Sequence, residues 1–267
     1  MSVIGGQMKN WGHLDVVMNT SPTKYDRSFY EFIDAKALES AVVVIPYVKQ
    51  LLEIRSVIDF GCGQGFWLHL WQQSGVDAIA GVDGAYVDID RLLFSPEAFV
   101  PHDLSTPIDL GRRFDLVQSL EVAEHISAEC ADTFIDNLAR HGDVILFSAA
   151  LPGQCGIQHV NERPFAYWRA RFSRRGFLVF DPLRPKLLSE DDVAWWYRYG
   201  LLVYAREFVL GDLPEPLRNS RVEDNVRIPD YSPSSYRLRR LVMRWMPTRF
   251  KEWCVRRYME RALQGNQ

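Results

Sequence analysis

Four side chains that can bind a metal ion or transfer a proton follow two strands predicted from the sequence. Glu121, Glu124 and His125 come after the fourth predicted strand, and His159 lies in the loop after the fifth. The spacing i, i+3, i+4 places the first three on one face of a helix that we expect to begin at Leu120. Ligands bind at the carboxyl ends of strands in parallel sheets, so we expect the loop to bring the later histidine there. Two carboxylates and two imidazoles are a suitable ligand set for Mg²⁺, Mn²⁺, Fe²⁺ or Zn²⁺.

The same residues also agree with metal-free interpretations. His159 or His125 can act as a plain general base with Glu124 beside it, because an imidazole titrates near neutral pH. Alternatively, the acidic residues only complement the dipole of a helix N-terminus and line a pocket. The sequence leaves the metal site, the general base and the pocket lining open.

A glycine-rich turn earlier in the chain is suited to a nucleotide-like ligand. Residues 57–60 form a predicted buried strand, and residues 66–72 continue as a helix. Between them lie Gly61, Gly63 and Gly65. Glycine lets the backbone approach a ligand closely, and a helix N-terminus offers free N–H groups. The strand, turn and helix together predict a cofactor site.

Two aspartates indicate which cofactor fits this turn. Asp59 lies two residues before the first glycine, and Asp83 ends a second predicted strand, residues 78–82. The glycine spacing is G-x-G-x-G rather than the G-x-G-x-x-G of dinucleotide enzymes, and no Lys-Ser/Thr pair of a phosphate-binding loop follows. An acid before the glycines suits the ammonium group of S-adenosylmethionine (SAM), and Asp83 is placed to bind ribose hydroxyls. An NAD-linked oxidoreductase is therefore disfavoured.

Over residues 56–207 the chain resembles the class I SAM-dependent methyltransferases. The glycine turn, the acid after the second strand and residues 102–104 occur in the order typical of that family. The resemblance implies that Asp103 binds the adenine amino group, that Leu104 packs on the adenine ring and that Ser119 contributes to the cofactor site. It also implies an SN2-type transfer of the SAM methyl group to an oxygen.

The acidic and histidine residues resemble the metal site of two groups of O-methyltransferases. Glu-x-x-Glu-His with a later histidine is similar to the site in small-RNA 2′-O-methyltransferases that modify RNA 3′ ends, and a related arrangement occurs in quinol-type O-methyltransferases of ubiquinone biosynthesis. The resemblance implies four metal ligands, Glu121, Glu124, His125 and His159. The spacing from the third to the fourth ligand is shorter here, and the RNA-holding domains of those enzymes are not evident.

A further resemblance, to bacterial class I methyltransferases associated with glycan biosynthesis, suggests the acceptor. It depends on four stretches that begin at Ser119, Phe147, His159 and Tyr167, namely S-L-E-V-A-E-H, F-S-A-A-L-P-G-Q, H-V-N-E and Y-W. The usual pattern there has glycine where this chain has Cys155. The resemblance implies O-methylation of a sugar, a glycan or another vicinal diol, with an RNA 3′ end or a quinol ring as the alternative acceptor.

A non-catalytic regulator that binds SAM is an alternative of a different class. Such a protein would keep the cofactor glycines and leave the acidic and histidine residues idle. The sequence contains both sets, which favours an enzyme.

The alternation of strands and helices predicts an α/β fold with a doubly wound Rossmann-like sheet of seven strands. We expect the sheet to be mostly parallel, with one antiparallel strand in the edge region. Strands are predicted at residues 57–60, 78–82, 99–101, 114–119, 144–148, 177–180 and 201–207. A helix over residues 29–52, with a kink or break at Pro46, is expected to cover the sheet.

The chain divides into four predicted parts. Residues 1–55 form an N-terminal lead-in, weakly patterned over its first half, with covering helices. Residues 56–210 form the SAM-binding core. The segment 211–235 is rich in Pro, Asp and Asn and is predicted to be a linker. Residues 236–267 form a basic amphipathic helical tail.

Length and composition agree with one principal domain, since the chain has 267 residues and 47% hydrophobic content. A net charge of −3 does not favour nucleic-acid binding. Four cysteines without C-x-x-C pairing, no signal peptide and no run of about 18 apolar residues indicate a cytoplasmic protein with reduced thiols. The expected partner is a small-molecule or glycan acceptor, and nothing in the sequence indicates an oligomeric state.

The C-terminal tail combines a high positive charge with apolar stripes. Residues 237–261 carry nine Lys or Arg and two Glu, a local charge of +7. Helical spacing groups its apolar side chains into two stripes, Leu238, Leu241, Val242 and Trp245 before Pro247, and Phe250, Trp253, Cys254 and Tyr258 after it. Such a helix either packs on the protein core, which is the ordinary case, or lies on an anionic membrane surface at the inner face of the membrane. RNA binding is less favoured, because the aromatic residues share one helix face.

Overall fold

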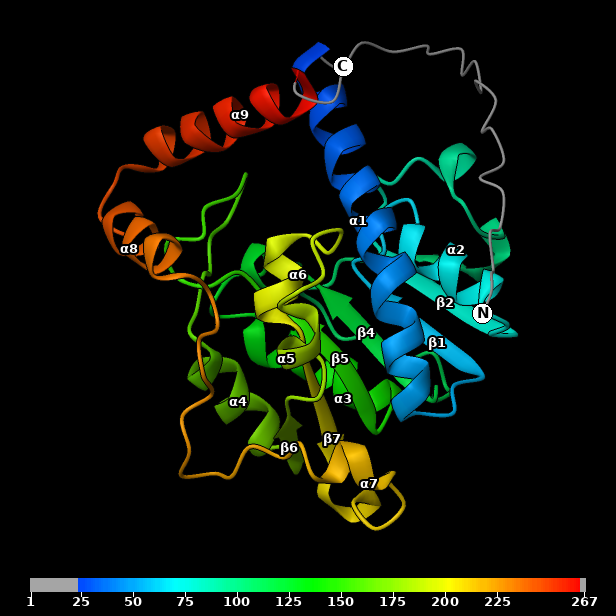
Figure 1. Cartoon of the computed structure of the whole chain (residues 1–267). Helices are drawn as coiled ribbons and strands as arrows, with labels where there is room; N and C mark the ends of the chain where they lie inside the picture. Colours follow the sequence, from blue (N-terminus) through cyan, green and yellow to red (C-terminus); the bar gives the residue numbers. More distant parts are fainter. Residues whose placement is uncertain (1–23, 265–267) are drawn as a thin grey trace, which may run out of the picture.

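A seven-stranded sheet forms the centre of the molecule (Figure 1). The computed structural model describes residues 24–264, so most of the predicted lead-in, residues 1–23, lies outside the described residues. The strands are β1 (Ser56–Phe60), β2 (Ala78–Asp83), β3 (Phe99–Pro101), β4 (Leu116–Leu120), β5 (Val144–Ser148), β6 (Phe177–Phe180) and β7 (Leu202–Arg206). Their order is β3-β2-β1-β4-β5-β7-β6. Only β7 pairs antiparallel with its neighbours, which confirms the predicted fold class.

The order of the strands reverses at the centre of this sheet. β1 pairs with β2 on one side and with β4 on the other, so the chain turns in opposite directions from these two strands. Ligands of doubly wound sheets bind beyond the carboxyl ends of the strands at such a reversal. The glycine turn follows β1, and Glu121 follows β4, so both predicted sites start at this edge.

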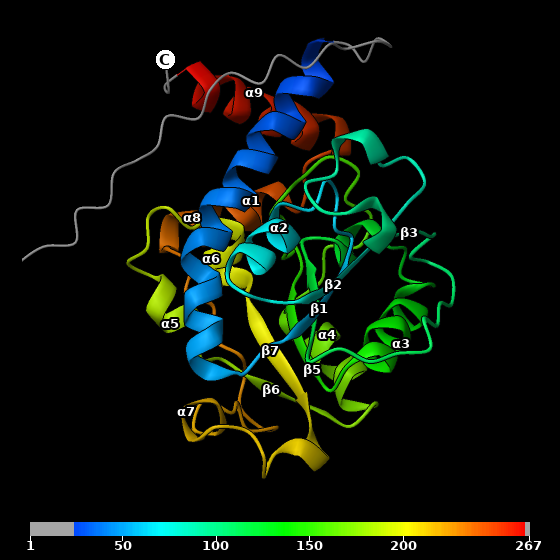
Figure 2. The ribbon, with the colours of Figure 1, turned by 90° about the vertical axis from the view of Figure 1, so that its right-hand side faces the viewer.

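Helices cover both faces of the sheet (Figures 1 and 2). One face carries α1 (Lys24–Leu51), α2 (Phe66–Gln73), α5 (Arg184–Leu187) and α6 (Trp195–Gly200), and the other carries α3 (Ala131–His141) and α4 (Phe165–Ser173). Successive strand residues point to opposite faces, so Leu146 of β5 belongs to the core under α1 and Ile145 to the core under α3. Short 3₁₀ turns occur at Ile89–Arg91, Pro96–Ala98, Ala123–His125 and Glu207–Val209.

The long covering helix α1 begins earlier than predicted and is not broken by its proline. Pro46 lies inside α1, which continues to Leu51, so the predicted break is wrong. A proline inside a helix costs roughly 3 kcal/mol because it removes one backbone hydrogen bond. Val44 and Val48, on either side of it, are buried in the core, and this burial offsets the cost.

The connection between β6 and β7 is a packed insertion that holds α5 and α6. Its Arg184 is fully buried and forms two hydrogen bonds with Asp181, of 2.9 and 2.7 Å. The same guanidinium donates to the carbonyl of Pro229 at 3.0 Å. The segment predicted as a linker, residues 211–235, contains the helix α7 (Glu215–Arg218), and Leu217 within it is fully buried. This segment therefore packs on the domain.

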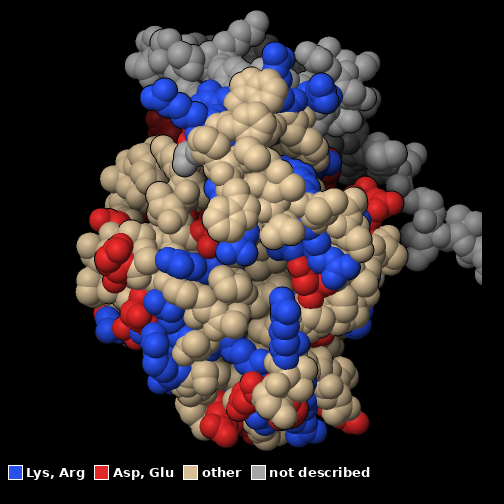
Figure 3. Space-filling model, turned by 90° about the vertical axis from the view of Figure 1, so that its left-hand side faces the viewer, with Lys and Arg blue, Asp and Glu red and all other residues tan. Residues whose placement is uncertain are grey.

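Two helices, α8 (Ser234–Met243) and α9 (Thr248–Gln264), end the described chain. α9 lies beside the start of α1 in both ribbon views, and the rings of Phe32 and Tyr258 meet edge to face at 6.3 Å. α8 packs on the protein, as one of the two predictions states, but it does so through Arg240 and Met243, and its apolar stripe is exposed. Figure 3 shows the side of the molecule on which α8 lies. Among the described residues no helix is long and apolar enough to cross a bilayer.

Candidate functional site

The three glycines after β1 have three different surroundings. All have a positive φ, of 85°, 53° and 84° for Gly61, Gly63 and Gly65, which only glycine adopts readily. A Cβ at Gly61 would lie 2.3 Å from a methyl group of Val122, and one at Gly65 would lie 2.2 Å from the ring of Phe94. A Cβ at Gly63 would have no described atom within 4 Å. The first and third glycines therefore serve the packing of the protein, whereas Gly63 faces open space where a ligand can approach.

Asp83 ends β2 beside this turn. Its Oδ2 accepts a hydrogen bond from the N–H of Gly63 at 2.8 Å. Its Oδ1 accepts from the N–H of Gly84 at 2.7 Å and from the hydroxyl of Tyr86 at 2.5 Å. Tyr86 is 84% exposed, so a ligand hydroxyl can take the place of its phenol. The structure thus puts the predicted ribose-binding carboxylate next to the open glycine.

Asp59 is buried beneath the turn. Its Oδ2 accepts a hydrogen bond from the amide of Gln118 at 3.0 Å, and the oxygen of that amide accepts from the indole N–H of Trp71 at 3.0 Å. The pKa of Asp59 is raised to about 8, mainly because the carboxyl group is buried. The hydrogen bond from Gln118 lowers this pKa, and the negative charge of Asp83 raises it further. A nearby positive charge would favour the ionised carboxylate, which suits the predicted ammonium group.

The remaining predicted cofactor residues lie in different environments. Asp103 is exposed after β3, and its Oδ1 accepts from the hydroxyl and the N–H of Ser105, which lowers its pKa. Leu104 is 7% exposed and packs in the core. Ser119 is fully buried, and its hydroxyl donates to the carbonyl of Phe60 at 2.9 Å, so it ties β4 to β1.

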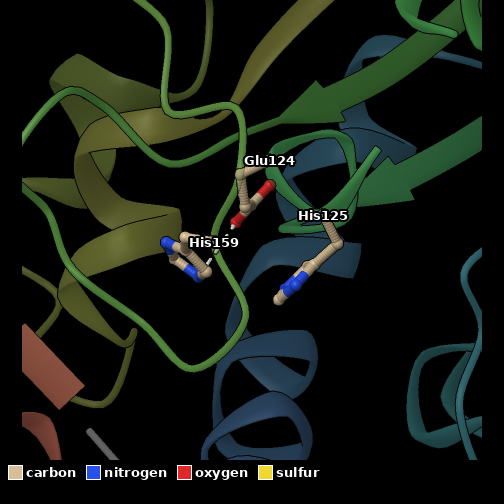
Figure 4. A group of neighbouring side chains, drawn as sticks. All are labelled: Glu124, His125 and His159. Atoms are coloured by element: carbon tan, nitrogen blue, oxygen red, sulfur yellow. Dashed lines mark ion pairs between the residues drawn. The ribbon is translucent and has the colours of Figure 1, made fainter. Parts of the chain in front are cut away.

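Glu124, His125 and His159 meet beyond the ends of β4 and β5, and their side chains point toward a common space (Figure 4). One ligand atom of each lies within 4.8 Å of the other two. Nε2 of His159 lies 3.9 Å from Oε1 of Glu124, and the two imidazole rings are 4.9 Å apart at 88°. Neither oxygen of Glu124 has a hydrogen-bond partner among the described residues, although both are buried. Burial, followed by the charge of Glu121, raises the pKa of Glu124 well above its usual value.

Both imidazoles are held through Nδ1. In His125 this atom donates to the carbonyl of Gln158 at 3.2 Å, and in His159 it donates to Oε1 of Glu162 at 3.0 Å. A carbonyl oxygen can only accept, so the lone pair of His125 lies on Nε2. Desolvation of that ring and the nearby His159 lower the pKa of His125 to about 4, so it is neutral at pH 7. Each Nε2 atom is thereby left to bind a metal ion or take a proton.

The loop after β5 is shaped to bring His159 to this place. The N–H groups of Val160 and Asn161 both donate to the carbonyl of Glu124 at 2.9 Å. A Cβ at Gly156 would lie 1.9 Å from Nε2 of His159, so glycine leaves the room that the imidazole occupies. The loop and the turn after β4 are therefore joined at the cluster itself.

Glu162 also holds this loop, through hydrogen bonds with its backbone. Its Oε2 accepts from the N–H of Gly153 and its Oε1 from the N–H of Cys155, both at 2.8 Å. Burial opposes the ionisation of Glu162, but the hydrogen bonds from His159 and from these N–H groups outweigh it and lower its pKa. Cys155 has a φ of 66°, in the left-handed region that favours glycine.

The predicted helix beginning at Leu120 is wrong. Leu120 still pairs with Ser148 as the last residue of β4, and Glu121 then adopts a φ of 57°. Only the 3₁₀ turn Ala123–His125 follows, so Glu121 and Glu124 do not share a helix face. Oε2 of Glu121 instead accepts a hydrogen bond from Gln154 at 2.7 Å, and burial raises its pKa. Three of the four predicted ligands meet, and Glu121 lies outside that group.

Sequence reasoning assigned no role to Gln118, Gly156 or Glu162. Gln118 is the one amide in the run of apolar residues of β4, and it pairs in register with Asp59, so a polar residue in a buried strand was the available signal. Glu162 lies three residues after His159 in a segment without regular structure, where spacing has no fixed geometric meaning.

A cavity of about 340 Å³ opens beside His159 and Glu162. Its lining includes the cations Arg163, Arg244 and Lys251. Arg244 directly follows α8 and Lys251 belongs to α9, so the C-terminal helices border the site. The lining of the cavity thus contains three cationic side chains and the carboxylate of Glu162.

Comparison with known proteins gives a family and a fold. A family model described as "Methyltransferase domain" matches residues 29–198. DesVI from Streptomyces venezuelae is 14% identical, with 70% of this chain and 100% of that chain covered at a TM-score of 0.52. The sugar N-methyltransferase KedS8 from a Streptoalloteichus species is 21% identical, with 75% and 99% covered at a TM-score of 0.50. No curated protein sequence matches the chain. These two solved structures share its fold.

Proposed function

This chain belongs to the methyltransferase domain family. We propose that it uses SAM as its methyl donor and methylates a hydroxyl oxygen of a sugar, a glycan or another vicinal diol. One observation carries the choice of oxygen. Glu124, His125 and His159 meet beyond the ends of β4 and β5, at the same sheet edge as the glycine turn. A hydroxyl is a poor nucleophile until it is deprotonated or polarised, and this cluster is suited to that task.

The cofactor is assigned to the edge of the sheet around the glycine turn. The open space at Gly63 admits the cofactor, and the carboxylate of Asp83 next to it takes the ribose hydroxyls. Asp59, under the same turn, attracts the methionine ammonium group. Oδ2 of Asp103, which accepts no hydrogen bond from the described residues, takes the adenine amino group.

The reaction itself is a single displacement. The acceptor oxygen attacks the methyl carbon, the bond from that carbon to the sulfonium sulfur breaks, and S-adenosylhomocysteine leaves. The hydroxyl proton passes to Nε2 of His159, because Nδ1 of that ring already donates to Glu162. Holding donor and acceptor in line contributes ~7–11 kcal/mol to lowering the barrier.

The cluster also fits a divalent metal ion. Glu124 offers two buried oxygens without partners, and His125 and His159 each offer Nε2. A bound ion would lower the pKa of the acceptor hydroxyl. The Gln158 carbonyl and the Glu162 carboxylate orient the two rings, as the outer partners of metal-binding histidines do.

The cavity supports an acceptor that carries a negative charge. Arg163, Arg244 and Lys251 line it, and no ion pair of these three side chains is found among the described residues. A sugar or polyol with a phosphate or carboxylate beside its hydroxyls matches this lining.

The test is a methylation assay with labelled SAM and a panel of sugars and polyols, with and without phosphate groups. NMR of the product distinguishes an O-methyl from an N-methyl group. Glu124→Gln should abolish transfer while SAM affinity, measured by calorimetry, stays unchanged. Glu129→Gln, an exposed change on the same segment, is the matched control. An N-methylated product, or full activity of Glu124→Gln, would refute the proposal.

A chelator then separates the two roles of the cluster. If activity stops with chelator and returns with Mg²⁺, Mn²⁺ or another divalent ion, the three residues act as metal ligands. If activity continues in chelator but His159→Ala is inactive, the histidine acts as a metal-free general base.

A further inference from the structure

Three apolar side chains of α8 and one that follows the helix are exposed on the surface of the protein. Leu238, Leu241, Val242 and Trp245 follow one another at i, i+3, i+4 and i+7, and their exposed fractions are 62%, 55%, 48% and 82%. A docked helix normally buries such a stripe. Here three side chains of the helix and the tryptophan that follows it stay about half exposed or more in the described part of the chain.

The opposite face of α8 holds the helix in this orientation. Arg240 and Met243 are buried, and Arg240 forms an ion pair with Asp230. The ring of Tyr236 lies 4.9 Å from that of Trp195 on α6. A Cβ at Gly153 would lie 2.0 Å from the carbonyl oxygen of Arg240, so α8 packs against the backbone of the His159 loop. The outward direction of the apolar stripe therefore follows from specific contacts.

The next helix also carries exposed apolar side chains. Phe250 and Trp253 of α9 are 44% and 53% exposed, and their rings stack at 5.8 Å. Arg257, one turn later, lies 5.8 Å from the ring of Trp253. We call the exposed apolar side chains of α8 and α9, together with Trp245 between them, the apolar face.

Positive charges border the apolar face. The periodicity of a helix puts Arg237 and Arg244 on one flank of the α8 stripe and Arg239 on the other. In the upper part of Figure 3, Lys and Arg side chains lie on both sides of uncharged ones. Residues 237–261 carry +7, whereas the whole chain carries −3, so the positive charge is concentrated in this segment.

We propose that α8 and α9 dock this enzyme on the surface of an anionic lipid bilayer. The apolar face enters the boundary between headgroups and acyl chains, and the flanking arginines contact the anionic headgroups. Tryptophan is favoured at this depth, since its ring is apolar and its N–H can bond to headgroups or water. Both kinds of side chain support this proposal. Apolar side chains alone would not distinguish an anionic surface from a neutral one, and cationic side chains alone would not explain the exposed apolar face.

Docking in this orientation brings the candidate site to the headgroups. Arg244 and Lys251 belong to the basic segment and also line the cavity beside His159. An acceptor displayed at the bilayer surface could therefore reach the cavity without leaving the lipid.

The experiment is co-sedimentation of the full chain with vesicles of phosphatidylcholine alone and of phosphatidylcholine mixed with phosphatidylglycerol. The protein should sediment only with the anionic vesicles and should be released as salt rises. Charge reversal of Arg237 and Arg239 to Glu should lower the partition coefficient by about fivefold or more for each residue. Arg91→Glu, at an exposed position distant in sequence from α8 and α9, should leave the partition coefficient unchanged.

The apolar contribution is tested separately. Leu241→Gln and Trp245→Gln should release the protein even at low salt, whereas Phe208→Gln, at a position that is 73% exposed, should not. Equal recovery with neutral and anionic vesicles would overturn the proposal. So would a chain that binds no vesicles but forms a dimer, or binds RNA, through these same residues. All substituted side chains are exposed, and unchanged thermal unfolding would verify that the variants fold.

Discussion

Nδ1 of His159 lies 3.0 Å from Oε1 of Glu162, and the same carboxylate accepts the N–H groups of Gly153 and Cys155. One side chain thus fixes both the path of the loop after β5 and the direction of the imidazole. The backbone of this loop also contacts α8 at Gly153. The candidate site is therefore connected to α8 through the hydrogen bonds of Glu162 and the packing of Gly153 against the helix.

Replacing Glu162 with Gln should lower methyl transfer by about 10–100-fold, because the amide holds the imidazole and the two N–H groups less strongly than a carboxylate. SAM affinity should not change, since the cofactor is assigned to the glycine turn. Steady-state kinetics and calorimetry check the two halves of this prediction. Glu129→Gln is the control. If Glu162→Gln is as active as the parent protein, Glu162 does not position the imidazole.

Adding a methyl group at Gly156 should displace His159, because the new Cβ would lie 1.9 Å from its Nε2. We expect Gly156→Ala to lose most of the activity and to bind SAM normally. Gly211→Ala is a matched control, since a Cβ there meets no described atom within 4 Å. A fully active Gly156→Ala variant would show that the imidazole does not need this place.

The glycines after β1 should respond differently to alanine. Both Gly61→Ala and Gly63→Ala place a side chain at positive φ, which costs ~1–2 kcal/mol of stability. Gly61→Ala should cost ~1–3 kcal/mol more, because its Cβ overlaps Val122. Gly63→Ala should instead weaken SAM binding. Urea unfolding and calorimetric titration separate the two effects, and equal SAM affinity of Gly63→Ala and the parent would contradict the assignment of the open space.

Asp59 should make stability depend on pH. Its pKa is about 8 in the folded protein against 3.8 for an unperturbed aspartate, so the folded state binds more protons than the unfolded state between these two pH values. The free energy of unfolding should therefore fall as pH rises from about 4 to 8. Asp59→Asn should remove this slope, and urea unfolding at several pH values measures it. An unchanged slope in the variant would assign it to other groups.

SAM binding should also change the protonation of Asp59. An ammonium group near Asp59 favours the ionised carboxylate, so binding below pH 8 should release a proton. Calorimetric titration in two buffers of different ionisation enthalpy detects the release, and Asp59→Asn should lose it.

Short local patterns in the sequence determined the sheet. The predicted strands 99–101, 144–148 and 177–180 coincide with β3, β5 and β6, and the others differ by at most two residues at either end. Apolar runs bounded by turns determine such strands because burial on both faces of a sheet needs them. The glycine turn was also readable, since a positive φ favours one residue type wherever it occurs.

Only the tertiary structure decided which side chains meet. Helical spacing grouped Glu121 with Glu124, but the pairing of Leu120 with Ser148 extends β4 and turns Glu121 toward Gln154. Likewise, one face of α8 carries apolar side chains such as Leu238, and the opposite face carries Arg240. From the sequence we expected the apolar face to be the buried one. The ion pair of Arg240 with Asp230 and the close approach of Gly153 reverse that choice. Periodicity defines the faces of an element, whereas the contacts that select the buried face come from residues distant in the sequence.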